Sequence, residues 1–213
     1  MALRIFTNLS SLNSQRAMQI NNARLGSSLE RIASGIRLQR SSDDIAAMSV
    51  SDALHGDAVA LRQGAKNLAD GFSLINTADG AVSEQASILI RLREITSQAA
   101  TGTIGDTERA TVNMEFTALR AEFDRIAATS EFNGRKLLDG SLSSGSSDTT
   151  VIQLGLDSSD NNRFNLNTEI NLSATTSSNL GFGTDSISTE TAALTAMSNL
   201  TSAIEKLSAI RGR

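Results

Sequence analysis

The stretch that decides the fold is DIAAMSVSDALHGDAVALRQGAKNLADGFSLINTADGAVSEQASILIRLREITSQAA, residues 44–100. Every seventh residue along it is apolar: Ala47, Leu54, Leu61, Leu68, Ile75, Val82 and Leu89. A heptad repeat sustained over this length predicts a single helix, one face of which packs against other helices. At ~1.5 Å per residue this helix would span roughly 85 Å. Its glycines each cost about 1 kcal/mol relative to alanine, so packing partners must stabilise it.

Composition excludes several classes of function. The chain has 213 residues and a net charge of −4, which argues against general nucleic-acid binding. It contains no cysteine, and therefore no disulfide, thiolate metal site or cysteine nucleophile. The one histidine, His55, is interpreted as a surface or interface residue, because a single imidazole cannot build a multi-histidine metal site. We predict no cofactor, no metal and, since no apolar run approaches ~20 residues, no membrane span.

The segment before the long helix predicts an amphipathic helix in two halves, over about residues 2–36. Its second half carries apolar residues at helical spacing: Leu25, Leu29, Ile32 and Ile36. Asp43 or Asp44 is then placed to cap the long helix, where a carboxylate accepts hydrogen bonds from free backbone N–H groups and suits the helix dipole. A metal site at this Asp pair lacks further ligands, so the cap is the preferred interpretation.

A third helix is predicted after a turn at residues 101–105, with Asp106 or Thr107 as its cap. Its apolar residues are Val112, Phe116, Leu119, Phe123 and Ile126. The short turn and the matching apolar faces predict that this helix folds back antiparallel on the last part of the long helix. The helical pattern stops at Ser130, and residues 132–134 (Phe-Asn-Gly) predict a turn in which glycine supplies a positive φ.

The remaining chain changes its period. Residues 141–150, rich in Ser and Thr, predict a flexible connector. Residues 151–156 predict a strand, and residues 164–172 alternate as a second strand of a hairpin that must lie on the helices. The segment between them, 157–162, is interpreted as a turn, since it lacks the Gly and closing Glu of a calcium loop. A loop follows, and Ser188 or Thr189 caps a final helix with a second apolar row: Ala193, Met197, Leu200, Ile204 and Leu207.

The predicted helix lengths leave part of the long helix uncovered. The third and final helices each span roughly 35 Å at ~1.5 Å per residue, so they can flank only the distal part of the long helix. An apolar stripe of this size at the proximal part is expected to be an interaction surface. We name the four residues of the heptad row in this proximal part the assembly stripe: Ala47, Leu54, Leu61 and Leu68.

Five motifs, in order, resemble the bacterial flagellin family. Residues 5–8 and 11–12 resemble its opening, and SGIRLQRSSDDIAAMSVSDAL (34–54) its next motif. ADGFSLINTADGAVSE (69–84), IRLREITSQAATGT (90–103) and EFDRIAATSEFNGRKLLDG (122–140) resemble further motifs at the right spacing. The resemblance implies a mainly α fold: a long-helix bundle or coiled-coil rod with a small β-hairpin region, similar to the flagellin core.

The resemblance also implies a division of the chain. Residues 1–42 would form an inner-core helix and a spoke linker, and residues 43–140 the long and returning helices of the filament core. Residues 141–185 would form a linker, hairpin and loop without a large outer domain. Residues 186–213 would begin the returning C-terminal helix, truncated at Arg213, so that the C-terminal helical segments of the family are missing. Export-chaperone binding, which the family makes through that end, is not expected of this chain.

The resemblance further implies partners and a location. A flagellin is exported unfolded through the flagellar export apparatus and polymerises under a cap into the extracellular filament, next to junction proteins. The family's surface for the animal Toll-like receptor that senses flagellin corresponds here to Arg91, Ile95 and Glu115, with Arg93, Glu94 and Gln98 nearby. Arg91 and Ile95 lie one helical turn apart, and Glu115 can approach them across the helical hairpin. The alternative is that these residues make ordinary filament contacts.

Three alternative functions are weighed against a filament subunit. A hook–filament junction protein of the same superfamily has a similar core but lacks the full set of motifs. A non-flagellar coiled-coil adaptor is compatible with the heptads alone, but not with the ordered motifs and hairpin. An enzyme is disfavoured, because the chain has no HExxH motif and one histidine cannot supply the ligands of a zinc protease.

Overall fold

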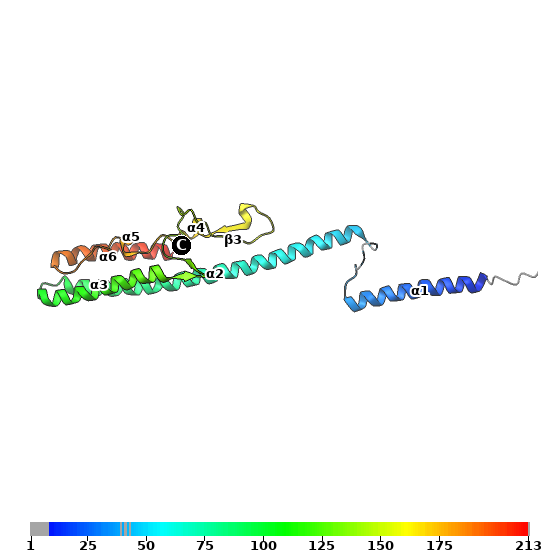
Figure 1. Cartoon of the computed structure of the whole chain (residues 1–213), viewed down its shortest axis with the longest axis horizontal. Helices are drawn as coiled ribbons and strands as arrows, with labels where there is room; N and C mark the ends of the chain where they lie inside the picture. The colour runs from blue at the N-terminus through cyan, green and yellow to red at the C-terminus, as the bar shows by residue number, and fades with distance from the viewer. Residues whose placement is uncertain (1–8, 39, 41, 43, 213) are drawn as a thin grey trace, which may run out of the picture. The chain divides into compact units, whose positions relative to one another are not determined.

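The computed structural model describes residues 9–38, 40, 42 and 44–212. The chain divides into two compact units, Met1–Val59 and Ala60–Arg213. The fold is mainly helical with two small antiparallel strand pairs, as predicted (Figure 1). Among the described residues, no helix combines the length and the apolar character that a membrane span requires.

The first unit contains helix α1 (Leu9–Ser34) and the beginning of helix α2 (Ile45–Ala99). Over its whole described length, α1 has no buried residue. Asp44 Oδ1 accepts a hydrogen bond of 3.0 Å from the backbone N–H of Ala47, the contact that an N-cap side chain makes. Asp43, the other predicted cap, lies outside the described residues.

The second unit is built on three helices. The distal part of α2 lies beside α3 (Asp106–Thr129) and α6 (Glu190–Arg211), both of which run antiparallel to it (Figure 1). The final turn of α6 meets α2 through an ion pair of 2.8 Å between Arg211 Nε and Asp79 Oδ1. Phe116 and Phe123 of α3 are fully buried, and the ring of Phe123 packs edge-on against that of Phe182 at 5.3 Å. The predicted return of the third helix onto the long helix is therefore confirmed.

The predicted N-cap is confirmed for α6 and wrong for α3. Thr189 caps α6 as predicted, since its side chain accepts a hydrogen bond from Ala192 N. The start of α3 was predicted wrongly: its N-cap is Gly105, which offers no side-chain acceptor. Asp106 is instead the first helical residue, where its charge suits the helix dipole.

The turn predicted at Phe-Asn-Gly is present and closes a short hairpin that the sequence did not reveal. Strand β1 (Glu131–Phe132) pairs with β2 (Arg135–Lys136). Asn133 and Gly134 between them have φ of 51° and 78°, the left-handed values of a tight primed turn.

The predicted hairpin exists, but both of its strands are shorter than expected. Strand β3 (Val151–Gln153) pairs antiparallel with β4 (Arg163–Asn165), and the 3₁₀ turn η1 (Asp160–Asn162) precedes β4. The expected continuation of the second strand to residue 172 is wrong, because the chain enters helix α4 (Leu166–Glu169). Asn165 causes this change: its side chain accepts from Asn167 N and caps the helix.

The hairpin sits directly on α2, at a seat made by Gly64, Asn67 and Gly71. A Cβ atom at Gly64 would overlap the carbonyl oxygen of Leu154, and one at Gly71 would overlap the end of the Ile152 side chain. Between the two glycines, Asn67 Nδ2 donates a 3.0 Å hydrogen bond to the carbonyl of Gln153. These glycines therefore permit a close approach of strand to helix, which offsets their cost in helix propensity.

The Ser/Thr-rich linker is held in place by Asn167 of α4, so its interpretation as a flexible connector is corrected. Asn167 Nδ2 donates to the carbonyls of Ser141, Ser143 and Asp148, and its Oδ1 accepts from Thr150 N. One buried amide thus binds several backbone groups of the linker. The composition of the linker does not indicate this contact. The loop that follows contains the short helix α5 (Ser177–Leu180).

Candidate interaction site

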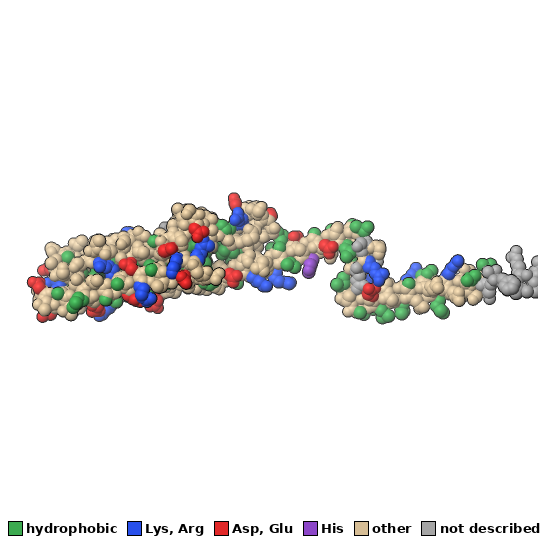
Figure 2. Space-filling view, viewed as in Figure 1, with side chains coloured by type: hydrophobic (Ala, Val, Ile, Leu, Met, Phe, Trp, Pro, Cys, Tyr) green, Lys and Arg blue, Asp and Glu red, His purple; other side chains and the backbone are tan. Residues whose placement is uncertain are grey.

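The assembly stripe is exposed along the proximal part of α2. Leu54 is 62% exposed, and Leu61 and Leu68 are exposed as well, while Ala47 is half-buried. Apolar side chains also line the uncovered α1 (Figure 2). The largest exposed ones on this helix are Leu9, Leu12, Met18, Ile20, Leu25, Leu29 and Ile32. Apolar surface of this extent is typical of a protein–protein contact.

Arg91 and Glu115 meet across the α2–α3 hairpin. Arg91 Nη2 lies 2.7 Å from Glu115 Oε1, and Arg91 Nη1 lies 2.8 Å from Glu94 Oε2 on the same helix. The hydrogen bond to Glu115, followed by that to Glu94, raises the pKa of Arg91 above its usual value. The three side chains are between 45% and 67% exposed, so the arrangement is a charged surface that a partner can reach.

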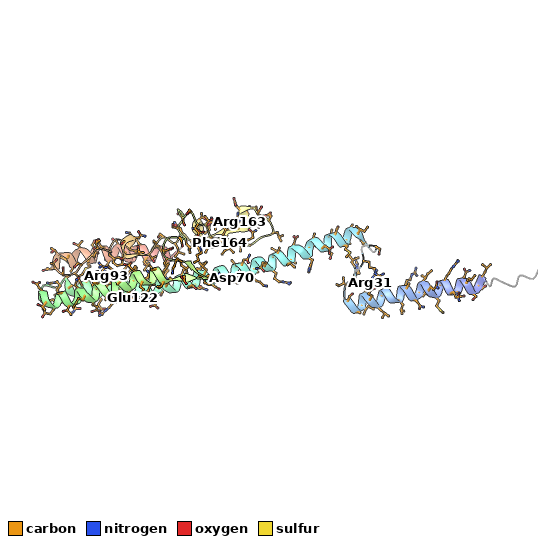
Figure 3. The ribbon with its side chains drawn as sticks, viewed as in Figure 1. Arg31, Asp70, Arg93, Glu122, Arg163 and Phe164 are labelled. Carbon is orange, nitrogen blue, oxygen red and sulfur yellow. The ribbon has the colours of Figure 1, made fainter. Side chains whose placement is uncertain are left out.

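The other predicted site residues divide between the surface and the core. Arg93 and Gln98 are exposed on α2. Figure 3 shows Arg93 on α2 and Glu122 on the neighbouring α3. Ile95 does not belong to this surface: it is 1% exposed and lies in the hydrophobic core. The expectation that Arg91 and Ile95 share an accessible face is therefore corrected, because the side chain one turn after Arg91 faces the helices that cover α2.

Arg109 is a buried charge that sequence reasoning did not single out. It lies in the first turns of α3 and is 5% exposed. Its Nε donates to the carbonyl of Ala99 at 3.0 Å and its Nη2 to that of Thr101 at 3.2 Å. Its Nη1 donates to Asp106 at 3.3 Å. Polar residues one turn before an apolar residue such as Val112 are common on helices. The sequence therefore did not indicate that Arg109 is buried and bonded to the end of α2.

Further polar contacts, some buried and some part-buried, join α2 and α3 to the loop before α6. Gln85 of α2 donates at 3.2 Å to the carbonyls of both Phe123 and Thr175. Asp124 accepts two hydrogen bonds of 2.7 Å from the backbone and hydroxyl of Ser177. Asn113 accepts one of 2.9 Å from Ile187 N. These side chains fix an irregular segment that has no periodic pattern of its own.

The described part of the chain offers no cluster of metal-binding side chains. No group of three or more His, Cys, Asp or Glu residues there could hold a metal ion. His55 lies exposed on α2. An open groove of about 400 Å³ between α2, β4 and the end of α6 is mainly apolar, lined among others by Ile75, Val82, Phe164 and Ile210.

Comparison with known proteins places this arrangement in a family. A family model described as the bacterial flagellin N-terminal helical region matches residues 5–143. The B-type flagellin of Pseudomonas aeruginosa is 39% identical over 155 residues, which cover 73% of this chain and 31% of that protein. Flagellin A of Vibrio cholerae is 39% identical over 163 residues, covering 74% and 43%. The chain thus spans less than half the length of these relatives.

Two further comparisons agree. The flagellin of Halalkalibacterium halodurans is 37% identical over 167 residues, which cover 78% of this chain and 59% of that protein. The crystal structure of Bacillus cereus flagellin superposes with a TM-score of 0.56 at 29% identity, over 67% of this chain and 77% of that one. The long helix, its antiparallel return and the five ordered motifs therefore have one explanation: the chain belongs to the bacterial flagellin family.

Proposed function

We propose that this chain is a structural subunit of the bacterial flagellar filament and serves swimming motility as a building block of a helical polymer. The observation that carries the proposal is the uncovered apolar surface of α1 and of the assembly stripe, in a chain of the flagellin family. Exposed leucines at heptad spacing leave a helix face without a partner among the residues that the structure describes. Contacts with neighbouring subunits would cover it.

A filament requires contacts that do not close on themselves. In such a heterologous interface, one surface of a subunit binds a different surface of the next, and repetition produces an open helical assembly. The assembly stripe and α1 offer apolar area for these contacts, and the charged face around Arg91 offers a second, polar surface. Flagellins are structural proteins, and we expect no enzymatic activity.

The proposed subunit reaches the filament from inside the cell. We expect export in the unfolded state through the flagellar export apparatus, growth under the cap, and contact with junction proteins at the filament base. The absence of proline and cysteine from the sequence suits this route, because the chain can refold after export without prolyl isomerisation or disulfide exchange. Its location would be the extracellular filament.

Seeded elongation tests the proposal. Fluorescently labelled chain is added to short flagellar filament seeds, and growth is followed by microscopy and sedimentation. Leu54→Asp, which places a charge on the assembly stripe, should abolish incorporation. The matched control is Leu156→Asp, at a leucine that is 50% exposed but lies in the hairpin loop, and this variant should elongate like the parent. Equal elongation by both variants, or none by the parent chain, contradicts the proposed function.

Recognition by the animal Toll-like receptor that senses flagellin is a second candidate function. The observation that favours it is the exposed Arg91–Glu115 pair, which joins the two helices of the predicted recognition surface. Arg91→Ala should weaken receptor binding at least about tenfold, as expected for an arginine at the centre of an interface. Arg125→Ala, an exposed arginine of α3 paired with Glu122, is the control. An unchanged receptor affinity in Arg91→Ala contradicts this candidate.

A further inference from the structure

We propose that Arg109 is a positioning residue that sets the register of α3 against α2, and thereby brings Glu115 opposite Arg91. The use of this face for recognition rests on the proposed function, whereas the register itself does not. Arg109 is buried at the start of α3, and its guanidinium bridges two carbonyls at the end of α2, those of Ala99 and Thr101.

Apolar packing alone leaves the register of this hairpin underdetermined. The apolar residues of α3 repeat at spacings of three and four, and those of α2 follow the same helical repeat. Two periodic stripes determine which faces meet, but a displacement by one turn again places apolar residues against apolar residues. In coiled coils this degeneracy is removed by a buried polar residue that finds its partner at one position only.

The partners of Arg109 exist at one place along α2. The last carbonyls of a helix have no intrahelical donor, unlike those in its interior. Ala99 is the final residue of α2, so its carbonyl and that of Thr101 are acceptors that a sliding α3 would leave behind. An arginine at this position therefore recognises the helix end itself.

Among the described residues, Gln85 also makes a buried side-chain hydrogen bond between α2 and α3, and it differs in this respect. Its amide donates to the carbonyl of Phe123 in the interior of α3. Interior carbonyls recur at every turn, so a shifted helix would present an equivalent acceptor to Gln85. Its bond to Phe123 stabilises the pair of helices without specifying their register, and its second bond, to Thr175, goes to the loop before α6 and not to α3.

The geometry of the surface ion pair follows from this anchor. Arg91 lies two turns before Ala99 on α2, and Glu115 lies almost two turns after Arg109 on the antiparallel α3. Both residues are thus carried to the same level by the contact at the turn, where Arg91 Nη2 and Glu115 Oε1 are 2.7 Å apart. A shift of one turn, ~5.4 Å, would separate the two charged groups beyond hydrogen-bond distance.

The test measures the register directly. Because the chain has no cysteine, Ser73→Cys and Thr117→Cys introduce two sites for spin labels, one exposed on each helix. Pulsed electron paramagnetic resonance then gives the distance between the labels in the full chain. With Arg109 present we expect a single distance population. In Arg109→Met we expect a second population, or a displaced one, differing by about 5 Å, the rise of one helical turn.

Matched variants separate register from general stability. Arg109→Lys retains the charge, but its ammonium is a point donor and cannot bridge two carbonyls as the guanidinium fork does, so it should also populate the displaced distance. If Arg109→Met fails to fold by circular dichroism, Arg109→Lys decides. Gln85→Met and the exposed Arg125→Met should both keep the parent distance.

Three results would overturn the proposal: a parent-like distance in the folded Arg109 variants, a displacement in Gln85→Met equal to that in Arg109→Met, or a displacement in Arg125→Met. Filament elongation and receptor binding are measured on the same variants. Lost binding at an unchanged distance contradicts the register role while leaving the proposed function standing. A displaced distance with normal elongation and receptor binding supports the register role and contradicts the use of this face.

Discussion

Leu54 and Leu89 occupy equivalent positions of one heptad row in α2, yet Leu54 is 62% exposed and Leu89 is 0% exposed. The distal part of the helix is covered by α3 and α6. The hairpin contacts α2 at Gly64, Asn67 and Gly71, while the leucines of the proximal row stay exposed. The repeat therefore specifies a helix and one of its faces. It does not specify whether that face belongs to a core or to a contact between molecules.

The largest expected effect is a difference in the free energy of unfolding when leucine is replaced by alanine at each of the two positions. Leu89→Ala should lower the free energy of unfolding by about 2–5 kcal/mol, because it removes buried methyl groups and leaves a cavity. Leu54→Ala should change it by less than about 0.5 kcal/mol, since the side chain is already exposed. Urea unfolding followed by circular dichroism measures both. Equal losses would show that Leu54 is buried in the isolated chain.

Glycine-to-alanine substitutions along α2 sharpen the comparison, because the change in the free energy of unfolding should have opposite signs where the hairpin covers the helix and where nothing does. Gly64→Ala should destabilise the chain by about 1–3 kcal/mol, because the new methyl group meets the backbone of Leu154. Gly71→Ala should cost less, since the end of the Ile152 side chain can move. Gly56→Ala, with nothing within 4 Å of its added Cβ, should stabilise by about 0.5–1 kcal/mol. The same unfolding experiment compares the three, and a uniform gain would contradict the proximity of hairpin and helix.

The smallest expected effect concerns the loop of the hairpin that covers α2. The side chains of Ser159 and Asn162 and the backbone N–H of Ser159 donate hydrogen bonds to Asp157 and lower the pKa of its carboxyl. The stabilisation is complete above the unfolded-state pKa of about 3.9 and is lost as the pH falls through the lower folded-state value. Carboxyl-carbon NMR titration should give the depressed pKa. Ser159→Ala should move it back toward the ordinary value.

The periodic parts of the chain were predictable from the sequence, and the irregular contacts were not. The heptad row gave α2, the alternating three and four spacing gave α3, and Thr189 marked the start of α6. These features depend on local spacing, which a single sequence displays. The exposure of the proximal row also followed, from helix lengths alone.

The misses share one physical cause: each depends on a specific contact of one side chain, which the spacing of apolar residues does not display. Residues 164–172 alternate like a strand, but the side chain of Asn165 caps a helix within them. Ile95 was placed on the wrong face by its distance from Arg91, and burial by the covering helices decided otherwise. Arg109 looked like an ordinary polar helix residue until its acceptors, ten and eight residues earlier, came within reach.

Asn167 has a consequence for how this chain could vary. Its one amide group holds four backbone groups of the linker over residues 141–150, so a single side chain offsets much of the conformational entropy that this segment loses on folding. Leu142 anchors the same segment differently, since its side chain is fully buried in the hydrophobic core. A change at Asn167 would therefore loosen the polar backbone contacts of the linker while the apolar anchor remains.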